Sequence, residues 1–183
     1  MALMGTKKIG EYKDILKGKV WVFPDNVDTD VISPGKYLDD MEATLAHTCD
    51  TLISEFPSEV KDGDIIVAGR NFGCGSSRET APIILQEKGI AAVVAESFAR
   101  IFYRSSFARA LPLLEIEDIA KEFQTGDDIE INIPNAEVTN KRTGKKFTAP
   151  KIPEILMNLL KNGGLEKQLL EELREKGKAA KKE

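Results

Sequence analysis

Short apolar segments alternate with polar and glycine-rich segments along the chain, and their lengths predict strands and helices in turn. Residues 20–23 form an apolar, β-prone run that Pro24 ends, and residues 65–68 form another after the polar turn 61–64. Residues 90–95 are a third continuous apolar run. Runs of this length without alternation are typical of strands that are buried on both faces.

Between these strands, apolar residues recur at helical spacing. In residues 43–56 they fall at Leu45, Cys49, Leu52, Ile53 and Phe56, which predicts one helix. A second helix is expected to start near Ser76–Arg78, with Ser77 and Glu79 in its first turn, and to end at Gly89. A third is expected from Phe98 to about Leu111, with one face made by Phe98, Ile101, Phe102, Ser105 and Ala108.

The second half of the chain changes pattern. Residues 129–133, 137–139 and 146–148 alternate apolar and polar side chains, which predicts antiparallel strands. Residues 152–162 read as a helix that Gly163 and Gly164 interrupt, and a leucine stripe then marks a last helix, at Leu165, Leu169, Leu170 and Leu173. The charged run 176–183 is expected to be frayed.

The order strand, glycine loop, helix, strand, helix predicts a parallel βαβ core with a right-handed crossover. The alternating segments add an antiparallel patch, so the expected fold class is mixed α/β. A chain of 183 residues suits one domain over 1–183, with a core at about 18–162 and a C-terminal helix and charged tail at 163–183.

Composition excludes several classes of function. The net charge is −4 with both signs interspersed, so we expect no nucleic-acid partner. The longest apolar runs are too short to cross a bilayer, and the first residues lack the apolar region of a secretory signal. The two cysteines fit a reducing cytoplasm and are too few to hold an iron–sulfur cluster. We therefore expect no metal site on this chain.

The strongest local feature is the segment Gly69–Arg78, which reads GRNFGCGSSR. Its glycines allow close approach of the backbone to a ligand, and two hydroxyls, a guanidinium and the start of a helix suit an anion such as a carboxylate. A plain strand-to-helix turn explains the same spacing equally well. The segment is neither a Walker loop nor a dinucleotide-binding motif.

Other chemistry has weaker support. Cys74 lies in this loop, but a cysteine nucleophile needs a histidine base, and the single His47 is expected to be solvated. Because Cys49 lies on an apolar stripe, it is expected to be a core residue. The acidic segment Asp25–Asp30 lacks the glycine and glutamate of a calcium loop, so it is either a hydrogen-bonded turn or a polar wall of the site.

Three segments resemble the small subunit of 3-isopropylmalate dehydratase. They are Val20–Leu38 (VWVFPDNVDTDVISPGKYL), Asp64–Glu79 (DIIVAGRNFGCGSSRE), and Ala95–Arg104 (AESFARIFYR) with Leu111–Leu113. They occur in the order and spacing of that family, and the likeness covers roughly residues 18–160. The resemblance is highly specific for the aconitase superfamily and less so for the substrate.

The resemblance implies the swivelling C-terminal domain of aconitases, with a β/β/α layering. It also implies a large subunit that carries a [4Fe–4S] cluster, while this chain closes the site from the other side. By motif position, Ser76 would be the catalytic base, and Ser77 and Arg78 would bind substrate carboxylate together with Thr29 and Asp30. The implied reaction isomerises 2- and 3-isopropylmalate by dehydration and rehydration, in leucine biosynthesis.

Departures from the family pattern bear on the substrate. Thr80 stands where the family usually has histidine, and Ser105–Ala108 replaces a usual Asn-Ala-Ile-Asn. The segment that reads the variable arm of the substrate would be Tyr37, Leu38, Asp39, Asp40 and Met41. The acidic pair argues against a distal carboxylate, but it does not make an apolar pocket. Isopropylmalate is the first expectation, followed by dimethylmalate, citramalate and homoaconitate. A stand-alone anion-binding module is the alternative from another class.

Overall fold

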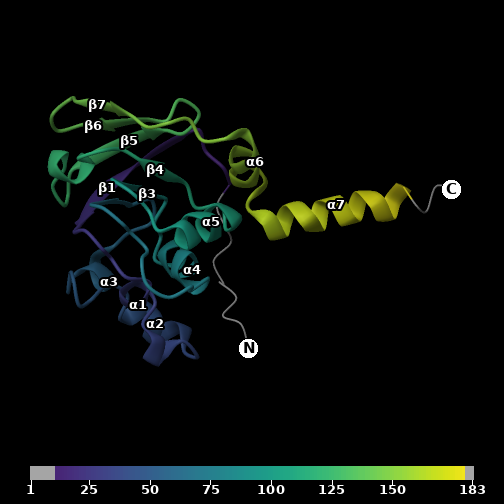
Figure 1. Cartoon of the computed structure of the whole chain (residues 1–183), viewed down its shortest axis with the longest axis horizontal. Helices are drawn as coiled ribbons and strands as arrows, with labels where there is room; N and C mark the ends of the chain where they lie inside the picture. The colour runs from purple at the N-terminus through teal and green to yellow at the C-terminus, as the bar shows by residue number, and fades with distance from the viewer. Residues whose placement is uncertain (1–10, 180–183) are drawn as a thin grey trace.

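The computed structural model describes residues 11–179. Residues 1–10, where no signal peptide is predicted, and residues 180–183 of the charged tail lie outside the described part. A single seven-stranded sheet runs through the described chain in the order β4-β3-β2-β1-β5-β6-β7. Figure 1 shows this sheet with helices against it and one helix, α7, projecting from the body.

One half of the sheet is parallel. It consists of β1 (Ile15–Phe23), β2 (Ile65–Ala68), β3 (Ala92–Ala95) and β4 (Leu113–Glu115), paired side by side. Every residue of β2 and β3 is buried, as expected for central parallel strands that are covered on both faces. The predicted strands at 20–23, 65–68 and 90–95 are therefore confirmed.

The other half is antiparallel. It contains β5 (Asp128–Asn132), β6 (Glu137–Asn140) and β7 (Lys146–Thr148), and β5 pairs with the first residues of β1. The long strand β1 thus belongs to both halves and joins them into one curled sheet. The predicted mixed α/β class, with a parallel core and an antiparallel patch, is confirmed.

Four helices in the described residues have eight residues or more. They are α4 (Thr80–Glu87), α5 (Arg100–Ala108), α6 (Glu154–Asn162) and α7 (Leu165–Ala179). Short helical turns fill the connections, namely α1 (Thr29–Ile32), η1 (Gly35–Tyr37), α2 (Met41–Ala46), α3 (Phe56–Glu59) and η2 (Ile119–Glu122). In Figure 1, α1, α2 and α3 gather on one side of the body, away from α7.

The single helix predicted for residues 43–56 is wrong. It is split into α2, which ends at Ala46, and α3, which begins at Phe56. Cys49 has φ +58°, which stops a right-handed helix, and its N–H donates to the carbonyl of Val31 at 2.9 Å. Cys49 and Phe56 are nevertheless fully buried, so the apolar spacing marked core positions but not the backbone that carries them.

Two further expectations need correction at helix surfaces. Ile101 was expected on the buried face of its helix, but it is 55% exposed, because α5 turns Phe102, Ser106 and Phe107 toward the core instead. At the C-terminus, residues 176–179 were expected to be frayed, whereas α7 continues through Ala179.

Aromatic side chains link the core to the glycine-rich loop. Phe72 lies inside that loop and is fully buried. Its ring makes edge-on contacts with Phe23 of β1 and Phe102 of α5, at centroid distances of 6.3 and 5.4 Å. Contacts of this kind stabilise by about 1 kcal/mol each beyond burial. The loop is therefore anchored at Phe72 before it reaches the serines.

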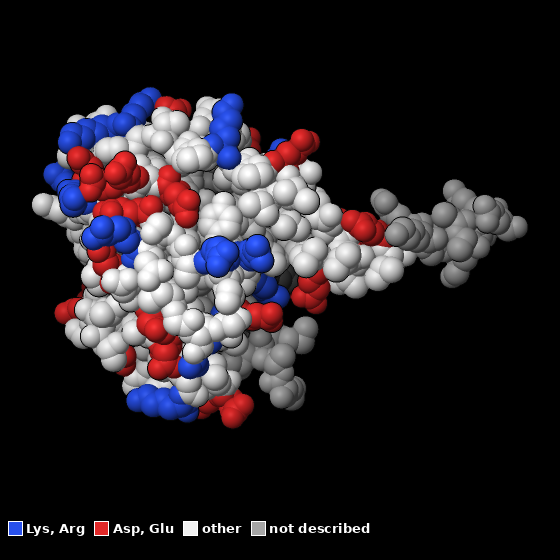
Figure 2. All heavy atoms as spheres, in the orientation of Figure 1, with Lys and Arg blue, Asp and Glu red and all other residues white. Residues whose placement is uncertain are grey.

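Charged side chains of both signs are interspersed on the face shown in Figure 2. Within residues 11–179, no helix combines the length and the apolar character that a membrane span requires.

Candidate functional site

The candidate site forms where the loops after β1 and β2 meet at the carboxyl edge of the parallel strands. The two loops run side by side, with a parallel bridge between Asp28 and Cys74. Gly73 donates its N–H to Val27, and Thr29 donates its N–H to Cys74, both at 2.8 Å. Ligand sites of parallel α/β sheets are usually found at this edge. The sheet topology thus brings together two motifs that lie more than forty residues apart.

Ser76, Ser77 and Arg78 lie in this loop and not in a helix. The helix expected to start at these residues begins only at Thr80. Glu79 is its N-cap residue, and the Glu79 side chain makes no capping hydrogen bond. The expected start was wrong because the loop continues alongside Asp28 and Thr29 before it turns into α4. Ser76 and Ser77 are exposed as a result.

The bend before Ser76 requires glycine at position 75. Gly75 has φ +91°, and a Cβ atom placed there would lie 2.3 Å from Oδ2 of Asp28. That carboxylate is itself fixed, because its Oδ1 accepts the N–H of Asp30 at 2.7 Å and caps α1. The close approach of Asp28 therefore sets the path of the loop into Ser76.

Arg78 is held by the turn after α1. Its Nη2 lies 2.6 Å from Oδ1 of Asp30, and its Nη1 donates to the carbonyl of Ser33 at 3.1 Å. Asp30 also accepts the N–H of Gly35 at 2.8 Å, which ties the turn to the same carboxylate. The Arg78 side chain is 19% exposed, and its Nε is buried with no hydrogen-bond partner among the described residues. Asp30 and Ser33 thus fix the orientation of the guanidinium.

Thr29 supports the serine segment from below. Its hydroxyl donates to the carbonyl of Ser76 at 2.8 Å, and the residue is 2% exposed. Both Asp30 and Thr29 were predicted as site residues. Asp30 contacts Arg78, and Thr29 contacts Ser76. The acidic segment is therefore the hydrogen-bonded turn that its sequence suggested, and it contacts the serine and arginine segment.

The segment Tyr37–Met41 leaves this turn and leads into α2. Asp40 caps α2 by accepting the N–H of Ala43 at 3.0 Å, and both Asp39 and Asp40 are exposed. The Tyr37 ring stacks on the His47 ring at a centroid distance of 4.5 Å. The prediction of a solvated histidine is only partly right, because His47 is half-buried and its Nδ1 lies 2.7 Å from Asp50.

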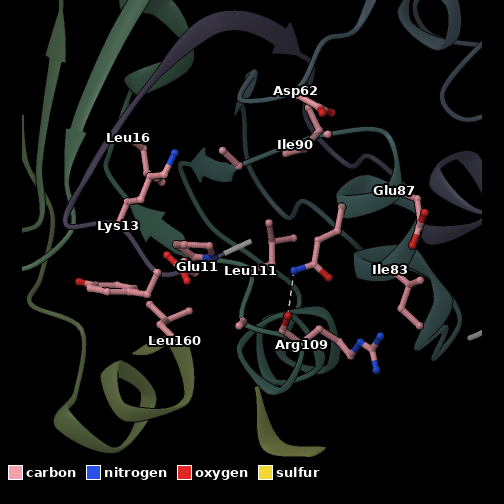
Figure 3. Close-up of a pocket in the computed structure, with 16 residues that line it drawn as sticks. Glu11, Lys13, Leu16, Asp62, Ile83, Glu87, Ile90, Arg109, Leu111 and Leu160 are labelled. Atoms are coloured by element: carbon pink, nitrogen blue, oxygen red, sulfur yellow. Dashed lines mark hydrogen bonds between the residues drawn. The ribbon is translucent and has the colours of Figure 1, made fainter. Parts of the chain in front are cut away.

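Two hollows bear on where the site lies. One of about 360 Å³ borders the site turn and is lined by Asp30, Val31, Pro34, Gly35, Lys36, His47, Asp50 and Thr51. The other, of about 270 Å³, lies at the amino end of the parallel strands, between Lys13, Leu16, Arg109 and Leu111 (Figure 3). None of the predicted site residues lines that second hollow. We therefore assign the site to the carboxyl edge and not to the hollow of Figure 3.

Cysteine chemistry has little support in this geometry. Burial and the nearby carboxylate of Asp28 raise the pKa of the Cys74 thiol, whereas a nucleophile needs a lowered one. Cys49 is fully buried, and desolvation raises the pKa of its thiol as well. Within residues 11–179, no group of three histidine, cysteine, aspartate or glutamate side chains is arranged to hold a metal.

Sequence reasoning missed two residues that organise the site. Asp28 caps α1 and contacts the Gly75 bend, and Ser33 places its carbonyl on Arg78. Asp28 had a weak signal, since aspartate often caps helices. Ser33 had none, because its role depends on a side chain that arrives from a distant loop.

Comparisons with known proteins show the family to which the chain belongs. The family model of the aconitase C-terminal domain matches residues 24–118, which contain both site loops. The 3-isopropylmalate dehydratase small subunit of Thermodesulfovibrio yellowstonii is 48% identical over 82% of this chain and 90% of its own length. The chain belongs to the family of 3-isopropylmalate dehydratase small subunits.

Other relatives extend the comparison to specificity and fold. The isopropylmalate/citramalate isomerase small subunit of Methanocaldococcus jannaschii is 46% identical over 84% of this chain and 92% of its own length. A crystal structure of 3-isopropylmalate dehydratase from the same organism has a TM-score of 0.83 at 38% identity, covering 90% of this chain and 99% of that one.

The positions at which this chain departs from the family pattern have local structural roles. Thr80 begins α4, and its hydroxyl lies 2.9 Å from the hydroxyl of Ser33. Ser105–Ala108 forms the last turn of α5, where Phe107 is fully buried and the hydroxyl of Ser106 is buried without a partner among the described residues. The first departure thus touches the turn that holds Arg78, while the second lies in the packing of α5.

Proposed function

We propose that this chain is the small subunit of a 3-isopropylmalate dehydratase, which interconverts 2- and 3-isopropylmalate by dehydration and rehydration in leucine biosynthesis. The observation that carries the proposal is the pairing of an exposed Ser76–Ser77 segment with an Arg78 whose guanidinium Asp30 and Ser33 hold in place. The names of the relatives support the same activity.

In this proposal, Ser76 is the base. Its Oγ, as the alkoxide, takes the proton from the carbon next to a substrate carboxylate. The hydroxyl group leaves the neighbouring carbon with a proton supplied by an acid of the large subunit, so that it departs as water. Rehydration then adds the hydroxyl group to the carbon that lost the proton, and the proton to the carbon that lost the hydroxyl group. Ser77 and Arg78 bind the carboxylate, since a guanidinium matches a carboxylate with two parallel hydrogen bonds.

Thr29 and Asp30 act through these residues. Thr29 holds the carbonyl of Ser76, and Asp30 holds a terminal nitrogen of Arg78. We therefore assign both a positioning role next to the substrate. Preorganised groups of this kind contribute to catalysis because no reorientation is needed when charge develops.

The energetics require a second subunit. Serine can act as a base only as its alkoxide. Its hydroxyl group stays protonated at neutral pH unless its pKa is lowered greatly. A helix N-terminus supplies at most about 2 kcal/mol, or about 1.5 pKa units, and its effect fades beyond the first turn. Ser76 precedes the start of α4 at Thr80. The remaining stabilisation must come from Arg78 and from cationic, water-excluding groups of the large subunit.

We place the [4Fe–4S] cluster on that large subunit. The donors of this chain do not fit a cluster, because Cys49 is sealed in the core and Cys74 lies beside the carboxylate of Asp28. The two free cysteines suit a reducing compartment, and we place the enzyme in the cytoplasm. We also treat residues 1–183 as one domain, with a core at about 18–162 and a C-terminal helix and charged tail at 163–183.

The substrate is assigned through the segment Tyr37–Met41. Asp39 and Asp40 are both exposed, and Asp40 also accepts the hydrogen bond that caps α2. Two exposed acids in this segment disfavour a distal carboxylate on the substrate by repulsion. We therefore place isopropylmalate first, with dimethylmalate and citramalate next and homoaconitate last.

The test is anaerobic co-expression with the large-subunit gene, followed by dehydration assays on these four hydroxy acids. The proposal predicts a stable complex with its highest kcat/KM on isopropylmalate, and no turnover by this chain alone. Highest activity on another of the four acids would change the assigned substrate but support the proposed type of reaction. Absence of a complex, together with tight binding of simple anions by the isolated chain, would instead support a stand-alone anion-binding module.

A further inference from the structure

A pair of hydroxyl groups links the start of α4 to the turn that holds Arg78. The hydroxyl oxygens of Ser33 and Thr80 lie 2.9 Å apart, so one hydroxyl donates to the other. Ser33 ends α1 and is fully buried, and Thr80 is the first residue of α4, two residues after Arg78. The bond therefore joins two segments that are 47 residues apart in the chain.

Ser33 is held through its backbone as well as through its side chain. Its N–H donates to the carbonyl of Thr29 at 2.9 Å, and its own carbonyl accepts from Nη1 of Arg78 at 3.1 Å. A buried hydroxyl that loses its partner is costly, so the bond to Thr80 is favoured wherever Ser33 stays buried. The carbonyl that Arg78 uses thus belongs to a residue that is tied to α4.

The turn after Ser33 fits closely around the guanidinium. A Cβ atom at Gly35 would lie 3.0 Å from Nη2 and 3.1 Å from Nη1 of Arg78. The Arg78 side chain is 19% exposed. Hydrogen bonds weaken steeply when their angle is poor, so a small shift of this turn against α4 would weaken the bond to Nη1.

The contact with Asp30 does not by itself fix the guanidinium. Oδ1 of Asp30 lies 2.6 Å from Nη2, but the Asp30 side chain is 60% exposed, so solvent screens the contact. A group held at one nitrogen can turn about that point, and the Ser33 carbonyl supplies the second point. We infer that Ser33 and Thr80 are positioning residues, whose hydroxyl bond keeps that carbonyl on Nη1 and so keeps Arg78 in one orientation.

The effect of this orientation on turnover rests on the proposed function, whereas the orientation itself does not. The first test therefore uses heteronuclear NMR of the Arg78 side chain in the full chain, with Arg78→Lys to assign its signals. A fixed guanidinium gives separate signals for Nη1 and Nη2, because rotation about the bond between Nε and Cζ is slow. We expect separate signals in the wild type and rotation about twofold to tenfold faster in Thr80→Val and in Ser33→Ala, which both keep the Ser33 carbonyl.

The hydroxyl bond predicts a specific pattern among further variants. Thr80→Ser keeps a hydroxyl and should keep the rotation of the wild type. The double variant S33A/T80V should rotate no faster than either single variant, because all three lack the same bond. Thr48→Val is the matched control, since the fully buried Thr48 donates its hydroxyl to the carbonyl of Thr44 at 2.8 Å. It should leave the rotation of Arg78 unchanged.

The second test is steady-state kinetics of the assembled enzyme. In Thr80→Val we expect KM for isopropylmalate to rise about twofold to tenfold with kcat nearly unchanged, because Arg78 binds the carboxylate in the ground state and the transition state alike. Thr80→Ser should restore the KM of the wild type. A role in folding alone would not give this result, since loss of folded enzyme lowers the apparent kcat and leaves KM unchanged.

Fast rotation of Arg78 in the wild type would overturn the proposal, and so would unchanged rotation in both Thr80→Val and Ser33→Ala. Additive effects in S33A/T80V would also overturn it, because the two residues would then act separately. Faster rotation with an unchanged KM would refute the positioning role. Faster rotation in a chain whose assembled enzyme turns over none of the four acids would support the inferred orientation of Arg78 and refute the proposed function instead.

Discussion

Replacing Asp30 separates the two functions that its carboxylate performs. Oδ1 of Asp30 lies 2.6 Å from Nη2 of Arg78 and accepts the N–H of Gly35 at 2.8 Å. Asp30→Asn keeps an acceptor of the same shape but removes the charge, and Asp30→Ala removes the acceptor. Comparing the two variants therefore separates the effect of the charge from the effect of the hydrogen bonds.

The expected magnitudes follow from exposure. A hydrogen bond to a charged group contributes about 1.5–3 kcal/mol, and a neutral one about 0.5–1.5 kcal/mol. The Asp30 side chain is 60% exposed, so solvent screening places its contribution at the lower end. We expect Asp30→Asn to lower the free energy of unfolding by under about 1 kcal/mol and Asp30→Ala by about 1–2 kcal/mol.

The catalytic effect should be larger than the loss of stability. A guanidinium that is free to turn binds the substrate carboxylate poorly, and misplacement by about 1 Å can cost about a hundredfold. In the assembled enzyme we expect kcat/KM to fall about tenfold in Asp30→Asn and about a hundredfold in Asp30→Ala, with most of the change in KM.

Steady-state kinetics of the assembled enzyme and urea unfolding of this chain measure the two effects. Glu130→Gln serves as the control, because Glu130 pairs with Lys17 at 3.2 Å on the antiparallel half, far from the site loops. It should leave kcat/KM unchanged. If both Asp30 variants kept the kinetic constants of the wild type, Asp30 would not position Arg78.

Two further changes test the site loop and the sheet. Gly75→Ala should lower the free energy of unfolding by about 1–3 kcal/mol and reduce kcat/KM. The control is Gly126→Ala, which should show backbone strain alone, because Gly126 has φ +92° and no atom lies within 4 Å of its Cβ position. Equal effects of the two variants on activity would contradict the role of Asp28. Bonds from Arg142 lower the pKa of Asp127, so its stabilisation is present above about pH 4 and is lost as the pH falls through that lowered pKa. Asp127→Asn should therefore cost about 2 kcal/mol in urea unfolding at pH 7 and much less near pH 3, and a cost that does not depend on pH would refute the charged contact.

The sequence predicted the elements whose causes are local. Buried strands such as 65–68 have a continuous apolar pattern, and Gly163 and Gly164 break the chain between α6 and α7, as expected. The segments that failed depend on distant contacts. The helix at 43–56 breaks where Cys49 bonds to Val31, and the helix at 76–78 is displaced because Cys74 pairs with Asp28. Periodicity cannot detect such partners, since they lie up to about fifty residues away in the chain.

For the candidate site, motif position selected residues that the fold brings into contact, but not the residues that support them. Thr29 contacts Ser76, and Asp30 contacts Arg78. The contact of Ser33 with Arg78 and that of Asp28 with the Gly75 bend appear only in the fold. The fold also gives Asp40 a structural role that the sequence reading did not assign, since it caps α2.

The central claim is that Ser76 acts as the base in a site completed by the large subunit. Its most direct test compares wild type and Ser76→Ala in the assembled enzyme, by measuring kcat and KM for isopropylmalate dehydration under anaerobic conditions. General base catalysis contributes about 10²–10⁴-fold, so we predict a complex with near-normal KM and kcat reduced by about a thousandfold. An assembled Ser76→Ala enzyme with near-normal kcat would contradict the account.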